Sequence, residues 1–193
     1  MDYNIVLDRL PTEYKGYLIR SDFRIGIQIS NCLSDVELDM SERITSALIL
    51  LFGNGVPDDF GIAYAGLIWF LSCGKKDITA DDYESDSDDS SEPEVMSFEQ
   101  DITMIYSAFR KCFDVNLARE HMHWFEFNAL LNDISDCAMT NVIDIRTMKL
   151  SDVDKKSRAK VLQLKAKYAI EHTDKDNNEL NEKIDRFNAL ASK

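Results

Sequence analysis

The chain has 193 residues, of which 45% are hydrophobic, and its formal net charge is −13. This length allows a buried core in one domain or in two small ones, and the apolar fraction is typical of globular proteins. The longest apolar run, residues 62–71, is about half of the roughly 20 residues that span a bilayer, so we expect no membrane span.

The four cysteines are widely spaced, with no C-x-x-C pair, and the start of the chain is polar and acidic rather than a secretory leader. Disulfides persist in oxidising compartments and are rare in the cytoplasm. We therefore expect reduced, mostly buried thiols in a cytoplasmic protein.

The negative charge is concentrated in one segment. Nine acidic residues and no Lys or Arg lie between Asp77 and Glu94, together with four serines and Pro93. A segment so rich in charge and so poor in apolar groups cannot bury enough surface to offset the entropy of ordering it. We therefore predict an N-terminal unit over residues 1–76, an acidic disordered linker over 77–96 and a C-terminal unit over 97–193.

The N-terminal unit begins with short strand-like pieces. Residues 5–7 are apolar, and residues 14–19 place Lys15-Gly16 between aromatic and aliphatic side chains. A Gly at such a position is typical of the tight turn of a β-hairpin. Ser21 or Asp22 then provides an N-cap for a helix that begins with Phe23.

Two helices complete the N-terminal unit. Ser41 is a candidate cap for a helix whose apolar residues recur at helical spacing until residues 53–55, Gly-Asn-Gly, end it. Asp58-Asp59 precedes an apolar stripe over residues 60–71, where carboxylates favour the positive end of the helix dipole. Gly74 is expected to end this second helix.

The C-terminal unit also reads as helical. Ser97 opens a capping-box pattern, a second helix is predicted over residues 117–132, and the capping logic repeats at residues 151–154. Residues 134–148 contain an alternation that fits a strand, but their helical surroundings favour helix. A last stripe covers residues 180–191. The predicted fold is mainly α, with two small helical units, the acidic linker and a short β-hairpin near the N-terminus.

No constellation of residues predicts catalysis. His121 and His123 would lie about 200° apart on a helix, which is poor geometry for one metal ion. Residues 174–178 imitate the start of a calcium loop, but Glu179 stands where that loop needs Gly. The chain has no Gly-rich phosphate loop and no G-x-S-x-G turn. We therefore predict no enzyme activity, no cofactor and no metal.

Basic residues gather in the segment 146–167. This stripe is open to three interpretations: a solvated helix face, a phosphate-binding surface or a protein-binding face. Three aromatic residues also lie within residues 124–127, and successive helical residues are 100° apart, so at least one of them, with Phe125 as the candidate, is expected to face a partner or a neighbouring unit. The residues that we expect to contact a partner are Trp124, Phe125, Phe127, Arg146, Lys155, Lys156, Arg158 and Lys160.

Several motifs in fixed order carry a resemblance to a known family. They are Leu10-Pro11-Thr12 followed by residues 17–24, residues 68–75, Phe98-Glu99-Gln100-Asp101, residues 105–109, residues 123–131 and Ile145-Arg146-Thr147-Met148. On these motifs the chain resembles the bacteriophage tail-assembly family often called the gene-product-fifteen proteins of long-tailed phages.

The resemblance implies a tail-assembly chaperone in the host cytoplasm. Such a protein binds and solubilises the tape-measure protein, is displaced as major tail-tube subunits polymerise, and is not retained in the virion. It implies partners in the tape-measure and tail-tube proteins, possible self-association and no membrane. The alternative is a nucleic-acid-associated phage protein that uses the basic helix 146–167. The near-neutral units and the acidic linker, which would repel phosphate, argue against nucleic acid.

Overall fold

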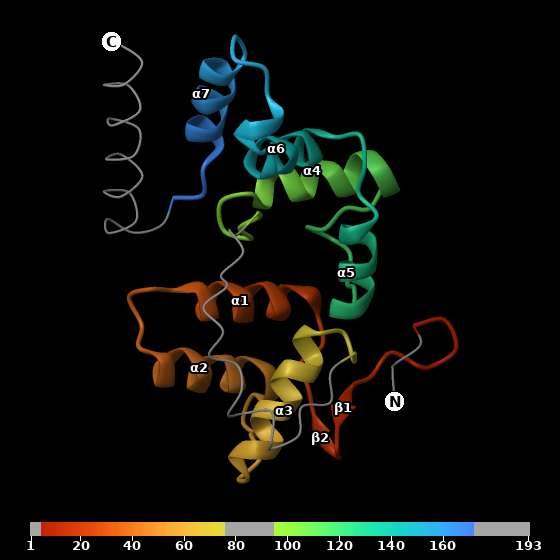
Figure 1. Ribbon diagram of the computed structural model, residues 1–193. Coiled ribbons are helices and arrows are strands. Elements are labelled where there is room, and N and C mark those ends of the chain that lie inside the picture. The colour runs from red at the N-terminus through yellow and green to blue at the C-terminus, as the bar shows by residue number, and fades with distance from the viewer. Residues whose placement is uncertain (1–4, 76–94, 172–193) are drawn as a thin grey trace. The chain divides into compact units, whose positions relative to one another are not determined.

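The computed structural model of the chain describes residues 5–75 and 95–171 (Figure 1). Its contacts divide the chain into two compact units, Met1–Asn141 (unit 1) and Val142–Lys193 (unit 2). Residues on both sides of the acidic segment therefore belong to unit 1, whereas the division predicted from the sequence follows that segment.

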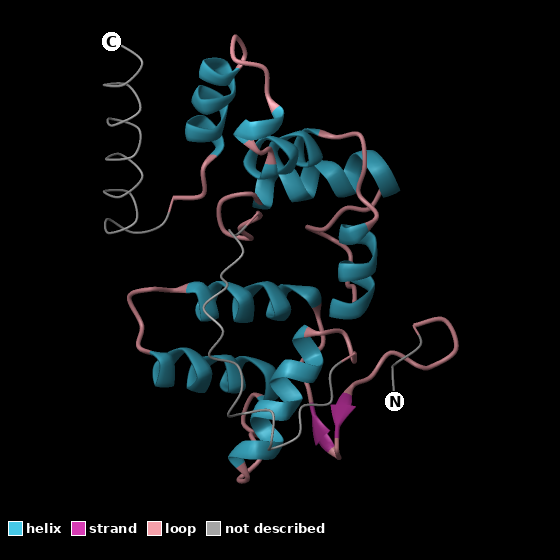
Figure 2. Cartoon of the chain, in the orientation of Figure 1, coloured by secondary structure: helices cyan, strands magenta, loops and turns pink. Residues whose placement is uncertain are grey.

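The described residues are mainly helical, with one short hairpin, as predicted (Figure 2). The helices are α1 Phe23–Ser34, α2 Met40–Phe52, α3 Phe60–Leu71, α4 Ile102–Phe113, α5 Trp124–Asn132, α6 Ala138–Thr147 and α7 Arg158–Tyr168, and a 3₁₀ turn lies at Leu150–Asp152. The helical interpretation of residues 134–148 is confirmed by α6. The stripe over residues 180–191 and the calcium-like sequence at 174–178 lie outside the described residues.

The hairpin consists of β1 Glu13–Tyr14 and β2 Tyr17–Leu18, which pair antiparallel. Lys15 and Gly16 both have positive φ, 47° and 86°, as a type I′ turn requires. The turn residues were therefore predicted correctly. The strand prediction for residues 5–7 was wrong, since these residues form turns and the side chains of Val6 and Leu7 are largely exposed.

Carboxylate caps set the starts of the first three helices. Asp22 caps α1 and Asp59 caps α3, each by accepting a hydrogen bond from a main-chain N–H of the first turn. The sequence offered Ser21 or Asp22 as the cap of α1 and placed Asp58-Asp59 at the positive end of the dipole of α3. Helix α2 begins at Met40, two residues earlier than a Ser41 cap would allow. Its cap is Asp39, because Glu42 at the third helical position completes a reciprocal capping box with it.

Two later helices begin after the predicted positions. Ser97 and Asp101 close a turn before α4, because the Ser97 N–H donates to the Asp101 carboxylate over 3.0 Å, and the helix starts only at Ile102. The helix predicted to start at residues 151–154 also begins later in the structure. The Asp154 carboxylate accepts from the N–H groups of Lys156 and Ser157, and α7 follows at Arg158.

The core of unit 1 is built by aromatic rings where α1, α3, α4 and α5 meet. The Phe127 ring stacks on Phe23 of α1 at 4.9 Å between centroids and on Phe109 of α4 at 5.0 Å. Phe70 of α3 stacks on Trp124 at 6.0 Å. Helix α2 packs against both α1 and α3. The core thus includes rings from before and after the acidic segment.

Close approach of rings to helix backbones explains two glycines inside helices. A Cβ on Gly66 of α3 would lie 2.8 Å from the Tyr14 ring and 2.9 Å from the Phe52 ring. A Cβ on Gly26 of α1 would lie 2.1 Å from the Trp124 ring. Both glycines therefore hold ring faces against the helix, which offsets their lower helix propensity.

The Cys73 thiol is predicted to react slowly with alkylating agents. Burial raises its pKa to about 11, although the nearby Lys75 ammonium acts in the opposite direction. At pH 8 only about one thousandth of such a thiol is thiolate, the reactive form. Iodoacetamide labelling followed by mass spectrometry should modify the exposed Cys112 well before Cys73. Equal rates in the native protein would contradict this prediction, whereas equal rates in denaturant are expected.

Candidate functional site

All three aromatic residues that were predicted to contact a partner lie in the core of unit 1. Trp124, Phe125 and Phe127 are 3%, 2% and 0% exposed. The expectation that at least one of them faces a partner or a neighbouring unit assumed a helix with a single covered face. Helix α5 is instead covered on several sides, so rings that point in different directions each meet another part of the chain.

Each ring of this group has its own neighbours. Trp124 lies on Gly26 of α1, and among the described residues its indole N–H has no hydrogen-bond partner, so ring packing rather than hydrogen bonding fixes its place. Phe125 meets Trp69 edge to face at 5.5 Å. These contacts make the three aromatic residues part of the folding core, and a partner-binding surface has to lie elsewhere in this conformation.

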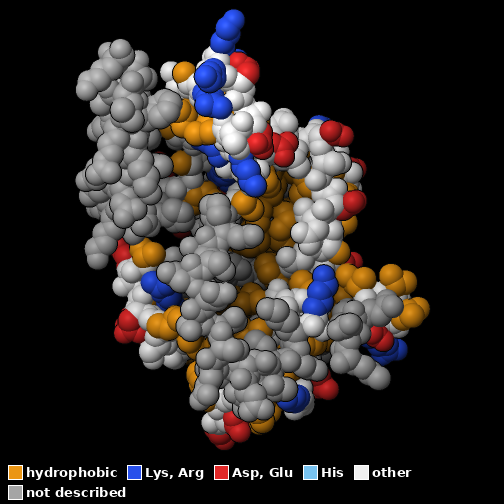
Figure 3. Space-filling model, viewed as in Figure 1, with side chains coloured by type: hydrophobic (Ala, Val, Ile, Leu, Met, Phe, Trp, Pro, Cys, Tyr) orange, Lys and Arg blue, Asp and Glu red, His pale blue; other side chains and the backbone are white. Residues whose placement is uncertain are grey.

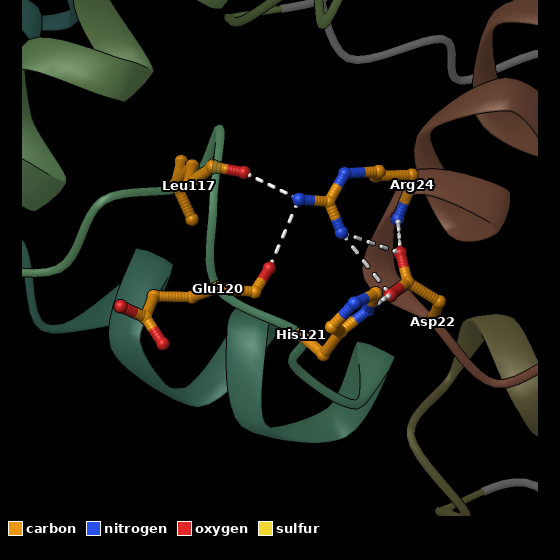
Figure 4. Close-up of polar contacts among 5 residues, drawn as sticks. All are labelled: Asp22, Arg24, Leu117, Glu120 and His121. Carbon is orange, nitrogen blue, oxygen red and sulfur yellow. Dashed lines mark hydrogen bonds and ion pairs between the residues drawn. The ribbon is translucent and has the colours of Figure 1, made fainter.

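A polar cluster on the surface of unit 1 joins α1 to the loop before α5 (Figure 4). Arg24 donates through Nη2 to the carbonyl oxygens of Leu117 and Glu120, at 2.7 and 2.9 Å. Its Nη1 lies 3.2 Å from the Asp22 carboxylate, which also lies 3.4 Å from Nδ1 of His121. The cluster holds residues 117–123 in a loop, which explains why α5 begins at Trp124 rather than at residue 117 as predicted.

Main-chain hydrogen bonds reinforce this junction. The N–H of Phe23 donates to Met122 O over 2.9 Å, and the N–H of Trp124 donates to Ser21 O over 2.8 Å. The two bonds form an antiparallel bridge centred on Asp22 and His123. The sequence indicated Asp22 as a possible helix cap. It did not indicate the contact between Asp22 and His123, because residues about a hundred positions apart form no local sequence pattern.

His123 is a buried cap rather than a metal ligand. Its Nδ1 accepts from the N–H of Phe125 over 3.0 Å, so the proton lies on Nε2, which donates to Pro11 O over 2.9 Å. Burial lowers the pKa of this imidazole below its usual 6.5, although the hydrogen bond to Pro11 O and the negative charge of Glu126 oppose the shift. Within the described ranges, no group of three or more His, Cys, Asp or Glu residues is arranged to hold a metal ion.

Acid is predicted to destabilise unit 1 through His123. Its pKa is lower in the folded chain than the 6.5 of the unfolded chain, so unfolding takes up a proton as pH falls below about 6.5. The stabilisation of unit 1 by neutral His123 is complete above that pH. It is lost progressively as the pH falls toward the pKa of His123 in the folded chain. His123→Asn retains a capping acceptor but cannot titrate. The stability of the wild type relative to this variant, from urea unfolding, should fall between pH 7 and pH 5, and a constant difference would contradict the assignment.

The predicted basic residues of unit 2 divide into two groups. Arg146 donates from Nε to Tyr168 O over 2.6 Å, and Lys165 donates to Arg146 O, so these two side chains tie α6 to α7. Arg158 donates to Val153 O over 3.1 Å before α7. Arg146 and Arg158 are thus half-buried and engaged with main-chain carbonyls.

The other group is exposed to solvent. Lys155, Lys156 and Lys160 are exposed, in the segment before α7 and in its first turn. Figure 3 shows Lys and Arg side chains gathered over this part of the surface. Residues 142–171 contain eight basic and four acidic residues, a net charge of +4 in a chain whose total is −13. No residue of α7 is fully buried. The three lysines are the predicted site residues that the structure leaves accessible.

The chain matches a known protein family over most of its length. Residues 6–170 match the family model described as Bacteriophage Gp15 protein. This match covers most of the chain and confirms the resemblance identified from the sequence motifs. No curated protein and no solved structure matches the chain. Every helix in residues 5–75 and 95–171 is too short or too polar to cross a bilayer.

Proposed function

We propose that this chain, which belongs to the bacteriophage Gp15 family, is a tail-assembly chaperone that binds the tape-measure protein and keeps it soluble in the host cytoplasm. The observation that supports the proposal most strongly is the family match over residues 6–170, which includes parts of both compact units. The chain then promotes assembly of the tail tube and is released as major tail-tube subunits polymerise, so it is not retained in the virion.

Unit 2 supplies a suitable contact surface for such a partner. Lys155, Lys156 and Lys160 are exposed, and Val161 and Leu164, one and four positions after Lys160 in α7, are half-buried apolar residues. This combination suits a long helical partner that exposes carboxylates beside an apolar stripe. Each exposed ion pair is worth only about 0–1 kcal/mol, so one copy binds weakly. Many copies on one rod hold it through repeated contacts and can still be displaced one at a time.

The proposal is tested by co-expression with the tape-measure protein of the same phage. The fraction of tape-measure protein in the supernatant should rise severalfold when this chain is present. The charge-reversed variant Lys155→Glu/Lys156→Glu/Lys160→Glu should lose most of that gain. If the tape-measure protein is equally soluble without this chain, the proposal is overturned.

The matched control reverses three exposed basic residues of unit 1, in Arg9→Glu/Lys15→Glu/Lys75→Glu. It changes the net charge by the same amount and should solubilise the partner as the wild type does. Equal loss in both triple variants would mean that net charge, and not the unit 2 lysines, controls the effect.

The same three lysines allow a test of the alternative function, binding of DNA or RNA. Phosphate binding by this surface predicts retention of DNA or RNA that weakens steeply as salt rises. Retention that depends on the three lysines, with unchanged solubility of the tape-measure protein, would favour the alternative. If the chain does not shift the band of DNA or RNA in a gel at low salt, the nucleic-acid alternative is excluded.

A further inference from the structure

We infer that a second copy of this chain is a partner, through exchange of the parts that meet across the acidic segment. The described residues before that segment, 5–75, are called the leading part, and residues 95–141 are called the following part. Both belong to unit 1. The inference does not depend on the proposed function.

The two parts meet in an apolar interface made mostly of aromatic rings. Phe127 of the following part stacks on Phe23 of the leading part, and both are at most 3% exposed. Trp124 covers Gly26 and stacks on Phe70, which is fully buried. Neither part could bury these rings alone, so separation would expose a large apolar surface on each, at a high cost in free energy.

The polar contacts around this interface give it a defined register. The main-chain bridge between Asp22 and His123 fixes the two backbones to each other. Arg24 holds the carbonyl oxygens of Leu117 and Glu120, so a shift of one residue would break both bonds. A surface with this arrangement of rings and donors is complementary to one specific sequence, which is the other part of the same chain. A second copy carries that sequence.

None of these contacts requires the two parts to belong to one molecule. Every residue in the contacts named above lies within residues 5–75 or 95–141, and any chain of the intervening length, 19 residues, has a maximum reach of roughly 60 Å. Two copies that exchange their following parts keep every contact of the closed form twice over, as in domain swapping. The balance between closed and exchanged copies is therefore set by concentration rather than by new contacts.

A rod that gathers many copies raises their local concentration, and exchange would then link neighbouring copies in pairs along it. This consequence alone rests on the proposed function. The exchange itself is a property of the purified chain, so its test needs no tape-measure protein and can fail or succeed independently of the chaperone proposal.

Complementation between two full-length variants tests the exchange. Phe23→Asp damages only the leading part, and Phe127→Asp damages only the following part. When the two variants are unfolded and refolded together, the intact leading part of one copy should bind the intact following part of the other. The expected product is a 1:1 dimer of twice the 22.1 kDa chain mass, measured by light scattering, with the tryptophan emission of the wild type partly restored.

The control pair is Phe23→Asp with Phe70→Asp. Both changes lie in the leading part, so no copy has an intact one and refolding together should not produce the dimer. Each variant refolded alone should also fail to produce it. The inference is overturned if the mixture of Phe23→Asp and Phe127→Asp gives only the light scattering and tryptophan emission of the two variants refolded separately. It is also overturned if the control pair forms the dimer equally well.

Discussion

Replacing Phe127 with Ala is expected to lower the free energy of unfolding of unit 1 by about 3–5 kcal/mol. The ring is fully buried and stacks on Phe23 and Phe109, so its removal leaves a cavity between parts that lie on opposite sides of the acidic segment. A loss of that size is a large share of the roughly 5–15 kcal/mol that stabilises a typical domain. Urea unfolding followed by tryptophan fluorescence measures it.

Phe60→Ala is the matched control for this prediction. Phe60 begins α3 and is 54% exposed, so the same substitution removes little buried surface. It should change the free energy of unfolding by about 1 kcal/mol or less. Similar losses for Phe127→Ala and Phe60→Ala would show that the ring stack of α5 does not hold unit 1 together.

Gly26→Ala is the second substitution with a large expected effect. The added methyl group would lie 2.1 Å from the Trp124 ring, so the ring or the helix has to move. Overpacking of this kind costs about 1–3 kcal/mol and outweighs the gain of roughly 0.5–1 kcal/mol that Ala brings to a helix interior. The urea midpoint should fall, and the tryptophan emission should shift because the indole is displaced.

Gly61→Ala provides the comparison within α3. Gly61 is exposed, and the nearest atom to an added Cβ is a carboxylate oxygen of Asp59 at 3.2 Å, which needs to yield only slightly. This variant should keep the midpoint of the wild type within error. A midpoint for Gly26→Ala at or above that of Gly61→Ala would contradict the close packing of Trp124 on α1.

Elements determined by neighbouring residues could be predicted from the sequence. The Lys15-Gly16 turn, the Asp22 cap and α3 with its Asp59 cap all depend on side chains within a few positions of the structure they create. The physical causes are a backbone that tolerates positive φ and a carboxylate that reaches the first free N–H groups of a helix. The alternative cap at Ser41 failed because Asp39 has a better partner in Glu42.

Elements determined by distant residues could not be predicted. Residues 117–123 were predicted as helix, but Arg24 and the main chain at residues 21–23 bind them in a loop. The burial of Phe125 depends likewise on Trp69, which lies on the other side of the acidic segment. A local pattern contains no information about such pairs, because tertiary contacts override local propensity.

Residue type alone led to the prediction of the partner-binding residues. Only the structure shows which of these residues are accessible. The sequence grouped eight residues as partner-binding without distinguishing their roles. The structure places three of them in the core and ties Arg146 and Arg158 to main-chain carbonyls. Lys155, Lys156 and Lys160 remain accessible, and they lie in unit 2.

The chaperone account is tested most directly by following the chain through infection. A tagged copy is purified from infected cells before tails are complete, and the co-purified proteins and the finished virions are both quantified by mass spectrometry. The account predicts that the tape-measure protein is enriched with the wild-type chain, that the Lys155→Glu/Lys156→Glu/Lys160→Glu variant loses it, and that virions contain tape-measure protein but not this chain. Absence of the tape-measure protein from the purified complexes, or a stoichiometric amount of this chain in virions, would contradict the account.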